Sequence, residues 1–252
     1  MKIFIILIIS IISIIPIIII IINFSKNSKN ISKNIYLTYK SKNIPNYIIK
    51  NWKLLNPTYN IHLYDNNDCI NFLYNNYGQL YVDIFNYIKD GPIKSDFWRC
   101  CIIYKYGGVY ADIDMEPLVS ISSIIKNNNK IKFYTCKSMI NIESVNPTII
   151  ISNKNHKILK YCIIEYIKKY KNKEKYSYWE WSIATIMYNA TKKYLNKNMI
   201  YGNKIYKDIL LFQEKGSSME PGKNYDNYIE YKGKKLFINR YKNYDSINHK
   251  FK

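Results

Sequence analysis

The fold of this chain is decided by residues 91–118, GPIKSDFWRCCIIYKYGGVYADIDMEPL. Gly91-Pro92 is typical of a helix start, because proline suits the first helical position, and apolar side chains then recur at helical spacing. Gly107-Gly108 ends that helix and allows a tight turn. The apolar run at 109–111 predicts a short buried strand, which leads into Asp112-Ile113-Asp114.

Asp112 and Asp114 are two residues apart, so on an extended backbone both side chains point to one face. Like charges held this close repel each other, which favours a cation beside them. Hard divalent ions prefer oxygen ligands, and Mg²⁺ is usually held by one or two carboxylates together with substrate phosphates. The alternative is a solvated turn, since Asp-x-Asp also occurs by chance.

A second polar pair lies in the preceding helix. Asp96 and Arg99 are three residues apart and share a helix face. An exposed ion pair of this kind contributes only about 0.3 kcal/mol. However, Arg99 is one of two arginines among 38 basic residues, and it lies eight residues before Gly107-Gly108. This context indicates a functional site rather than an ordinary surface ion pair.

Together these residues resemble the sugar-binding region of the DxD glycosyltransferases. The resemblance rests on Ser95-Asp96-x-x-Arg99 followed by Tyr106-Gly107-Gly108-Val109-Tyr110-x-Asp112-x-Asp114. This run is similar to glycosyltransferase family 32, of the initiating α-mannosyltransferase type, and to the glucosylating toxins. The resemblance implies an α/β fold of the GT-A kind, an αβα sandwich that binds a nucleotide-diphospho-sugar and retains anomeric configuration.

The resemblance also implies a set of site residues. Asp114 would hold Mn²⁺ or Mg²⁺, Asp112 would touch metal-bound water or ribose, and Asp96 with Arg99 would hold sugar hydroxyls. The implied donor-binding residues are Thr38, Tyr39, Ser95, Asp96, Arg99, Gly107, Gly108, Tyr110 and Asp112. Tyr39 ends the first expected strand, where an aromatic ring can stack on uracil or guanine for about 1–3 kcal/mol. The alternative for Tyr39 is an ordinary strand aromatic.

Three later residues are candidates for completing the metal shell. Glu214 and Ser217 loosely match a late Glu-x-x-Ser of the glucosylating toxins, and His249 corresponds to the C-terminal histidine of other GT-A enzymes. Ordinary polar loop residues are the alternative. Arg240, the second arginine, is a weaker candidate for contacting the donor diphosphate.

The elements before the motif alternate between strands and helices. We expect strands at 35–39 and 61–65 and helices at 44–56, 69–77 and 79–89. This order is typical of an α/β sandwich, in which ligands bind beyond the carboxyl ends of strands. The sequence contains no G-x-G-x-x-G or P-loop pattern, which disfavours a dinucleotide or Walker site.

Beyond the motif the pattern is weaker. We expect strands at 131–136, 148–152 and 209–212, and helices at 158–171 and 178–194. His156 is predicted to cap the first of these helices. Trp179 and Trp181 are predicted to pack in the core, with the acceptor side of the site as the alternative. A Thr-Gly-Pro turn common in the family is replaced by residues 184–187, so the acceptor pocket has no assignment.

The chain opens with Met1-Lys2 and an uncharged apolar stretch, residues 3–22. That length spans ~30 Å of hydrocarbon. We therefore predict a transmembrane signal-anchor at 1–23, a stalk at 24–34 and the catalytic domain at 35–252. A cleaved signal peptide is the alternative, although its apolar part is usually shorter. The flanking lysines favour a cytoplasmic catalytic domain, whereas the family resemblance implies a lumenal one.

The net charge of +20 raises the question of an anionic partner. The lysines are scattered through every segment rather than gathered in a stripe, so we predict a solvated surface and no nucleic-acid role. Five cysteines without a repeated spacing indicate neither a disulfide framework nor a zinc site.

We therefore expect a metal-dependent retaining glycosyltransferase that moves a hexose from a UDP- or GDP-linked donor to a glycan, protein or lipid acceptor. Front-face attack is expected, because no carboxylate is evident as a nucleophile. One alternative is a non-catalytic, membrane-anchored basic protein that binds anionic lipid or polyanions. A DxD phosphatase is disfavoured, because Glu116 stands where that fold carries Thr or Val.

Overall fold

The computed structural model describes residues 31–125, 130–199, 201–216, 227–239, 241, 243–245 and 248–251. The predicted signal-anchor at 1–23 and most of the predicted stalk lie outside these ranges. Among the helices that are described, none combines the length and the apolar character that crossing a membrane requires.

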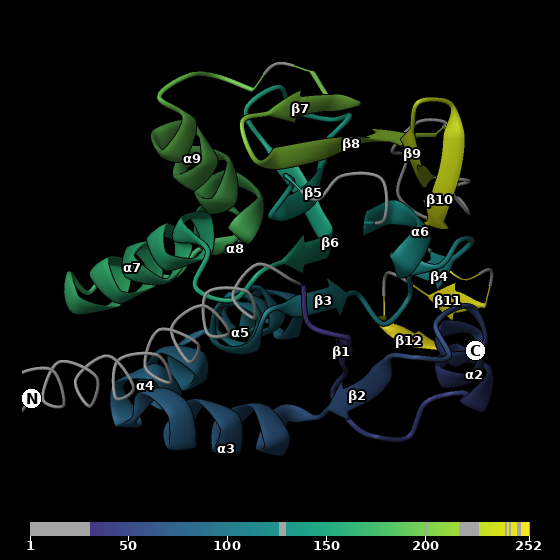
Figure 1. The fold of residues 1–252 in the computed structure, drawn as a ribbon. Coiled ribbons are helices and arrows are strands. Elements are labelled where there is room, and N and C mark those ends of the chain that lie inside the picture. Colours follow the sequence, from purple (N-terminus) through teal and green to yellow (C-terminus); the bar gives the residue numbers. More distant parts are fainter. Residues whose placement is uncertain are drawn as a thin grey trace, which may run out of the picture.

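The first half of the chain alternates between strands and helices as predicted (Figure 1). Its elements are β1 (Asn34–Thr38), α2 (Asn46–Leu55), β2 (Asn60–Tyr64), α3 (Asn66–Tyr77), α4 (Gln79–Tyr87), α5 (Gly91–Tyr106) and β3 (Gly108–Ala111). Helix α3 begins with a capping box, in which the Asp65 side chain accepts from the Asp68 N–H and Asp68 accepts from the Asp65 N–H. Reciprocal capping of this kind explains why the helix starts where it does.

The second half is richer in strands. Its elements are β4 (Glu116–Pro117), α6 (Ile121–Ile125), β5 (Phe133–Lys137), β6 (Val145–Ser152), α7 (Lys157–Lys171), α8 (Tyr178–Trp181), α9 (Ile183–Leu195), β7 (Lys204–Tyr206), β8 (Ile209–Lys215), β9 (Tyr228–Tyr231), β10 (Lys234–Ile238), β11 (Tyr244–Asp245) and β12 (Lys250–Phe251). His156 caps α7 by accepting from the Ile158 N–H, as predicted.

The single helix expected at 178–194 is wrong. Ser182 has an extended backbone that separates α8 from α9, and its hydroxyl accepts a hydrogen bond from the Ala184 N–H. A serine in this position is a typical N-cap, because its side chain satisfies one of the free N–H groups of the new helix. The break turns the start of α9 toward α5.

One mixed sheet forms the centre of the molecule. Its strand order is β2-β1-β3-β6-β5-β8-β9-β10-β4, with β7 paired to β8. Strand β1 is parallel to both β2 and β3, with Tyr36 opposite Tyr110, whereas β3 is antiparallel to β6. The carboxyl ends of β1 and β3 therefore meet at one edge, which brings Thr38 near Asp112.

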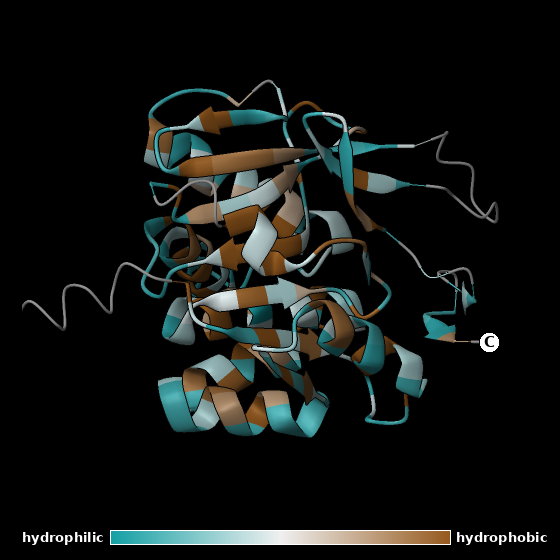
Figure 2. Ribbon diagram, turned by 45° about the vertical axis from the view of Figure 1, so that its right-hand side comes forward, coloured by the Kyte–Doolittle hydropathy of each residue, from teal (hydrophilic) through white to brown (hydrophobic). Residues whose placement is uncertain are grey.

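Helices cover both faces of this sheet, as expected for an α/β fold. One apolar cluster contains side chains of α3, α4, α5, α7 and α9 together with Tyr36 and Tyr110. The other contains side chains of α2 and α6 together with Val109 and Ala111. Successive residues of β3 thus face opposite clusters, as the alternation of a buried strand requires. Figure 2 shows the apolar residues concentrated along the central strands.

The Gly107-Gly108 turn connects α5 to β3, as predicted. Both residues have positive φ, 64° and 106°. A Cβ on Gly107 would lie 2.7 Å from the Lys154 backbone nitrogen, and one on Gly108 would lie 2.6 Å from the Asn34 backbone oxygen. Glycine is needed here because the backbone conformation and the space both exclude a side chain.

Candidate active site

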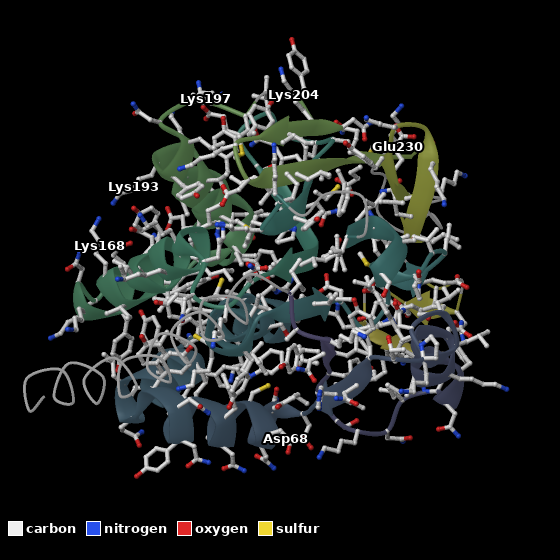
Figure 3. All side chains as sticks on the ribbon, in the orientation of Figure 1. Asp68, Lys168, Lys193, Lys197, Lys204 and Glu230 are labelled. Carbon is white, nitrogen blue, oxygen red and sulfur yellow. The ribbon has the colours of Figure 1, made fainter. Side chains whose placement is uncertain are left out.

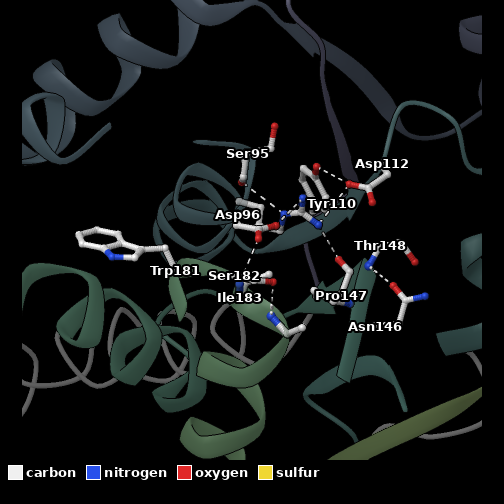
Figure 4. Close-up of polar contacts among 12 residues, drawn as sticks. Ser95, Asp96, Tyr110, Asp112, Asn146, Pro147, Thr148, Trp181, Ser182 and Ile183 are labelled. Atoms are coloured by element: carbon white, nitrogen blue, oxygen red, sulfur yellow. Dashed lines mark hydrogen bonds and ion pairs between the residues drawn. The ribbon is translucent and has the colours of Figure 1, made fainter. Parts of the chain in front are cut away.

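The centre of the site is a buried network around Arg99. Its Nη2 lies 2.9 Å from Asp96 Oδ1 on the same helix, and its Nη1 lies 3.1 Å from Asp112 Oδ1 at the end of β3 (Figure 4). Asp96 and Arg99 are only 6% and 4% exposed. This pair is therefore not the exposed helical ion pair that spacing alone would permit. It ties α5 to the first aspartate of the Asp-x-Asp motif.

Further contacts hold the guanidinium in one place. Arg99 Nη1 donates to the Pro147 carbonyl at 2.9 Å, and Nε donates to the Ser95 carbonyl at 3.3 Å. The guanidinium also lies over the Tyr110 ring, 4.2 Å from its centroid, which is a cation–π geometry. The Tyr110 hydroxyl in turn donates to Asp112 Oδ1 at 2.7 Å. Asp112 is therefore oriented by two donors on one oxygen.

Burial and charge act in opposite directions on this network. Burial raises the pKa of Asp96 to about 6, although Arg99 and the Ile183 N–H partly offset that effect. Burial alone would lower the pKa of Arg99, but Asp112, Tyr110 and Asp96 together hold its pKa above the ordinary value. The guanidinium therefore stays charged, and Asp96 is the group whose charge responds to mildly acidic pH.

A contact from a distant segment completes the network. The Ile183 N–H, in the first turn of α9, donates to Asp96 Oδ2 at 3.0 Å. A helix N-terminus carries partial positive charge and unpaired N–H groups, so it suits a carboxylate. This contact was not predicted, because the helix expected at 178–194 had no start at Ser182.

Asp112 and Asp114 lie on a turn rather than on the strand from which the shared face was predicted. Strand β3 ends at Ala111, and the Met115 N–H donates to the Asp112 carbonyl at 3.0 Å to close the turn. Both aspartates nevertheless line one cavity of about 480 Å³. The two carboxylates therefore reach the same cavity from a turn, and not from the extended strand that was predicted.

The cavity collects predicted residues from three separate parts of the chain. Those lining it are Thr38, Tyr39, Ser95, Arg99, Tyr110, Asp112, Asp114 and His249. They share its wall with Lys40, Asn66, Gly91, Pro92, Ile113, Tyr178, Tyr244 and Asn248. Tyr178, on α8, was not predicted as a site residue, because the sequence pattern assigned it only a place at the start of the helix expected at 178–194. A volume of this size is typical of a small-molecule site.

The C-terminal segment lies beside Tyr39. The Tyr39 hydroxyl donates to the His249 carbonyl at 2.8 Å, and its ring meets Phe251 edge to face with centroids 6.0 Å apart. His249 is thereby brought to the cavity although it lies 210 residues further along the chain.

Glu214 lies elsewhere. It is 5% exposed and does not line the cavity. Its carboxylate accepts from Asn146 Nδ2 at 2.7 Å, from Asn239 Nδ2 at 2.9 Å and from the Met139 N–H at 3.2 Å. The structure thus does not bring Glu214 to the aspartates, and its oxygens are occupied by protein donors. Ser217 and Arg240 lie outside the described residues.

Three of the predicted donor-binding residues also do not line the cavity. Gly107 and Gly108 lie at the opposite end of β3 from Asp112, where they form the turn described above. Asp96 lies behind Arg99, so it reaches the cavity through the guanidinium rather than directly.

The carboxylates fit a hard divalent cation. Arg99 and the Tyr110 hydroxyl both contact Oδ1 of Asp112, and 25% of the Asp112 side chain is exposed. Within the described residues no group of three or more His, Cys, Asp or Glu side chains could hold a metal ion by itself. An ion such as Mg²⁺ or Mn²⁺ at Asp112 and Asp114 would therefore complete its shell with donor phosphates and water, as Mg²⁺ commonly does.

Comparison with known proteins agrees with this geometry. A family model described as the glycosyltransferase sugar-binding region containing DXD motif matches residues 43–131. The initiation-specific alpha-1,6-mannosyltransferase of Candida albicans is 29% identical over 113 residues, which is 41% of this chain. The chain spans 29% of that relative's length.

The structure of the PaToxG glycosyltransferase shares the fold. It superposes with a TM-score of 0.50 and 18% identity, covering 71% of this chain and 76% of that one. All three comparisons lead to glycosyltransferases, which confirms the resemblance predicted from the motif. Over residues 43–131 this chain is thus similar to the glycosyltransferase sugar-binding regions that contain a DXD motif.

Proposed function

We propose that this chain is a metal-dependent retaining glycosyltransferase of the GT-A kind. It transfers a hexose from a UDP- or GDP-linked donor to a glycan, protein or lipid acceptor. The observation that carries the proposal is the shared cavity, in which Asp112, Asp114 and Arg99 of the motif meet Tyr39 from β1. The family match over residues 43–131 supports the same conclusion.

The wall of the cavity suggests how a donor would bind. Tyr39 offers an aromatic face for the nucleotide base, which is a sequence-tolerant mode of base binding. Asp112 and Asp114 would hold Mn²⁺ or Mg²⁺, which supplies a Lewis acid for the charge that develops on the leaving phosphate. Lys40 also lines the cavity and adds positive charge for the diphosphate.

Arg99 and Tyr110 serve to fix Asp112 before the donor arrives. Both donate to Asp112 Oδ1, so its carboxylate has a defined orientation without the donor. Preorganised polar groups of this kind act without reorganising during the reaction. Arg99 also lines the cavity itself, where its remaining donor capacity can orient sugar hydroxyls.

The transfer step follows from the charged groups available. The acceptor hydroxyl attacks the anomeric carbon from the face on which the diphosphate departs, while the bond between that carbon and the diphosphate oxygen breaks. The hydroxyl proton passes to the leaving phosphate. Among the described residues that line the cavity, Asp112 and Asp114 are the carboxylates, and both are assigned to the metal ion. Front-face attack is therefore favoured over a covalent intermediate.

We also propose that residues 1–23 anchor the enzyme to a membrane. The support is the uncharged apolar stretch at 3–22, whose length suffices for one span.

The test is nucleotide release by the full-length chain. UDP- and GDP-sugars are offered with and without Mn²⁺ to wild type, Asp112→Asn and Asp114→Asn. We expect release from one donor that needs the metal and falls by about 10²–10³ in each variant, the loss typical of removing one preorganised electrostatic group. Asp83→Asn, at an α4 aspartate paired with Gln79 outside the cavity, is the matched control.

Two outcomes count against the proposal. Release that survives both motif substitutions removes the site from the reaction. If the folded protein shows neither nucleotide release nor metal-dependent donor binding, the alternative hypothesis is favoured, in which a non-catalytic protein binds anionic lipid or polyanions through its basic surface.

A further inference from the structure

The short helix α8 exposes a large aromatic side chain. The chain has four tryptophans. Trp52, Trp98 and Trp181 are fully buried, whereas Trp179 is 76% exposed. The prediction that Trp179 packs in the core is therefore wrong, and the same prediction for Trp181 is confirmed.

Trp179 is paired with Tyr178 at the edge of the candidate active site. The two rings meet at 77° with centroids 5.1 Å apart. Tyr178 is 39% exposed and lines the cavity that also contains Arg99 and Asp112. Trp179 does not itself line the cavity but adjoins it through its contact with Tyr178, and we call this pair the aromatic rim.

The rim is held rigidly. Trp181 anchors α8 in the core, where its carbonyl accepts from the Tyr166 hydroxyl at 2.9 Å and its Nε1 donates to the Lys175 carbonyl at 3.4 Å. Directly after α8, Ile183 is bonded to Asp96, the partner of Arg99 (Figure 4). The aromatic pair is thus fixed relative to the Arg99 network, as a positioning surface must be.

A second cavity, of about 530 Å³, is lined by residues of α7, of the segment that follows α7, of α8 and of α9. Glu180 lines it together with Glu165, Tyr161 and Asn189. Carboxylates and amides of this kind accept and donate the hydrogen bonds that sugar hydroxyls offer. Trp179 stands in the chain between Tyr178 of the first cavity and Glu180 of the second.

We propose that Tyr178 and Trp179 form an acceptor subsite that binds a pyranose ring of a saccharide acceptor, and that the second cavity binds the next sugar. This inference rests on the proposed function. The C–H face of a pyranose is apolar, so it packs on an aromatic ring whose face is electron-rich. Lys169 and Lys193 line the second cavity together with its glutamates, so it offers both donors and acceptors to sugar hydroxyl groups.

The single exposed tryptophan gives a direct binding test. Acrylamide quenching of the intrinsic fluorescence of the full-length protein reports mainly on Trp179, because the other three tryptophans are buried. The probes are methyl glycosides of glucose, galactose, mannose and N-acetylglucosamine, with the trisaccharide of each. We expect one sugar class to protect Trp179, and its trisaccharide to bind about tenfold more tightly than the monosaccharide.

Kinetics test the same subsite. In Trp179→Ala the KM for the protecting saccharide should rise about tenfold, which corresponds to about 1.4 kcal/mol. In Trp179→Phe the KM should stay close to the wild-type value, because an aromatic ring is kept. Tyr74→Ala is the matched control, since Tyr74 is 58% exposed and lines neither cavity. It should keep the wild-type KM.

The outcomes separate this inference from the proposed function. If the wild type releases nucleotide from a donor but no saccharide protects Trp179, the subsite is overturned and the transferase proposal stands. If a saccharide protects Trp179 but no donor is turned over, the saccharide site stands and the transferase proposal fails. Protection by phosphatidylserine vesicles instead of sugars overturns the subsite and marks a membrane contact.

Discussion

Arg99 shows how one side chain can connect a local motif to a tertiary site. Spacing places it beside Asp96, and folding adds Asp112 at 3.1 Å and the Tyr110 ring at 4.2 Å. A charge this deeply buried is tolerated only when it is paired and fully hydrogen-bonded. The pairing leaves Asp96 as the member with an unusual proton affinity, since burial raises the pKa of Asp96 to about 6.

Asp96 should make stability depend on pH in a definite direction. Its folded-state pKa lies above its ordinary value of 3.8, so the folded protein binds this proton more tightly than the unfolded chain. Stability contributed by Asp96 is therefore full below pH 3.8 and is lost as pH rises toward 6, by at most about 3 kcal/mol.

Asp96→Asn should reduce that slope. Denaturant unfolding of wild type and variant at pH 4, 5, 6 and 7 measures it. The slope should not vanish, because burial also raises the pKa of Glu214. Equal slopes in the two proteins would mean that Arg99 keeps Asp96 ionised throughout this range.

Among the elements, the turn between α5 and β3 and the break between α8 and α9 position the site. The first requires glycine, because Gly107 and Gly108 both have positive φ and neighbouring backbone atoms leave no room for a Cβ. The second depends on Ser182, whose extended backbone frees the Ile183 N–H to reach Asp96. Helical periodicity predicted the helix before the glycines but continued straight through Ser182, since apolar residues recur on both sides of it.

Gly108→Ala should be strongly destabilising. Its Cβ would lie 2.6 Å from the Asn34 backbone oxygen, so strand β1 would have to move in addition to the strain of φ at 106°. We expect a loss of about 3 kcal/mol or more in the free energy of unfolding, measured by urea denaturation.

Gly78→Ala is the matched control for this substitution. Gly78 has a similar positive φ of 84° but no atom within 4 Å of its Cβ position. Only the conformational cost remains, so we expect a loss of about 1 kcal/mol. Equal losses at the two glycines would show that backbone conformation, rather than the close approach of β1, explains Gly108.

At the scale of the whole molecule, Glu214 connects distant parts of the sheet. It lies on β8 and accepts from Asn146 on β6, Asn239 after β10 and Met139 after β5. Asn146 Oδ1 in turn accepts from the Thr148 N–H, and the Thr148 carbonyl accepts from the Asp112 N–H at 2.9 Å. The carboxylate thus supports the backbone behind the Asp-x-Asp turn.

Glu214→Gln should act on stability rather than on metal binding. We expect a loss of about 1–3 kcal/mol, because charge-assisted hydrogen bonds to the carboxylate are weakened or left unmade. Urea denaturation and Mn²⁺ titration calorimetry of the same variant measure the two effects. Weaker Mn²⁺ binding with unchanged stability would instead show that Glu214 is a metal ligand.

The positive charge is also a property of the whole molecule. The labelled lysines Lys168, Lys197 and Lys204 lie on the periphery, with their side chains directed away from the sheet (Figure 3). Lys193 is the exception among the labelled lysines, since it lines the second cavity. This distribution agrees with the prediction of a solvated basic surface, which keeps a protein soluble without forming a specific site.

The residue pattern by itself determined the helix of α5, the two-glycine turn and the buried strand β3, with Asp112 and Asp114 directly after it. Each of these depends on neighbours within a few positions, where backbone sterics and side-chain periodicity decide the outcome. The α/β alternation of the first half followed for the same reason.

Only the tertiary structure decided which distant residues join the motif. It brought Tyr39, Tyr178 and His249 to the cavity and placed Glu214 behind it. It also gave Asp96 a partner on α9 and left Trp179 in solvent. These outcomes depend on strand order and on how helices pack across the sheet, and contacts between such distant segments leave no periodic trace in the chain.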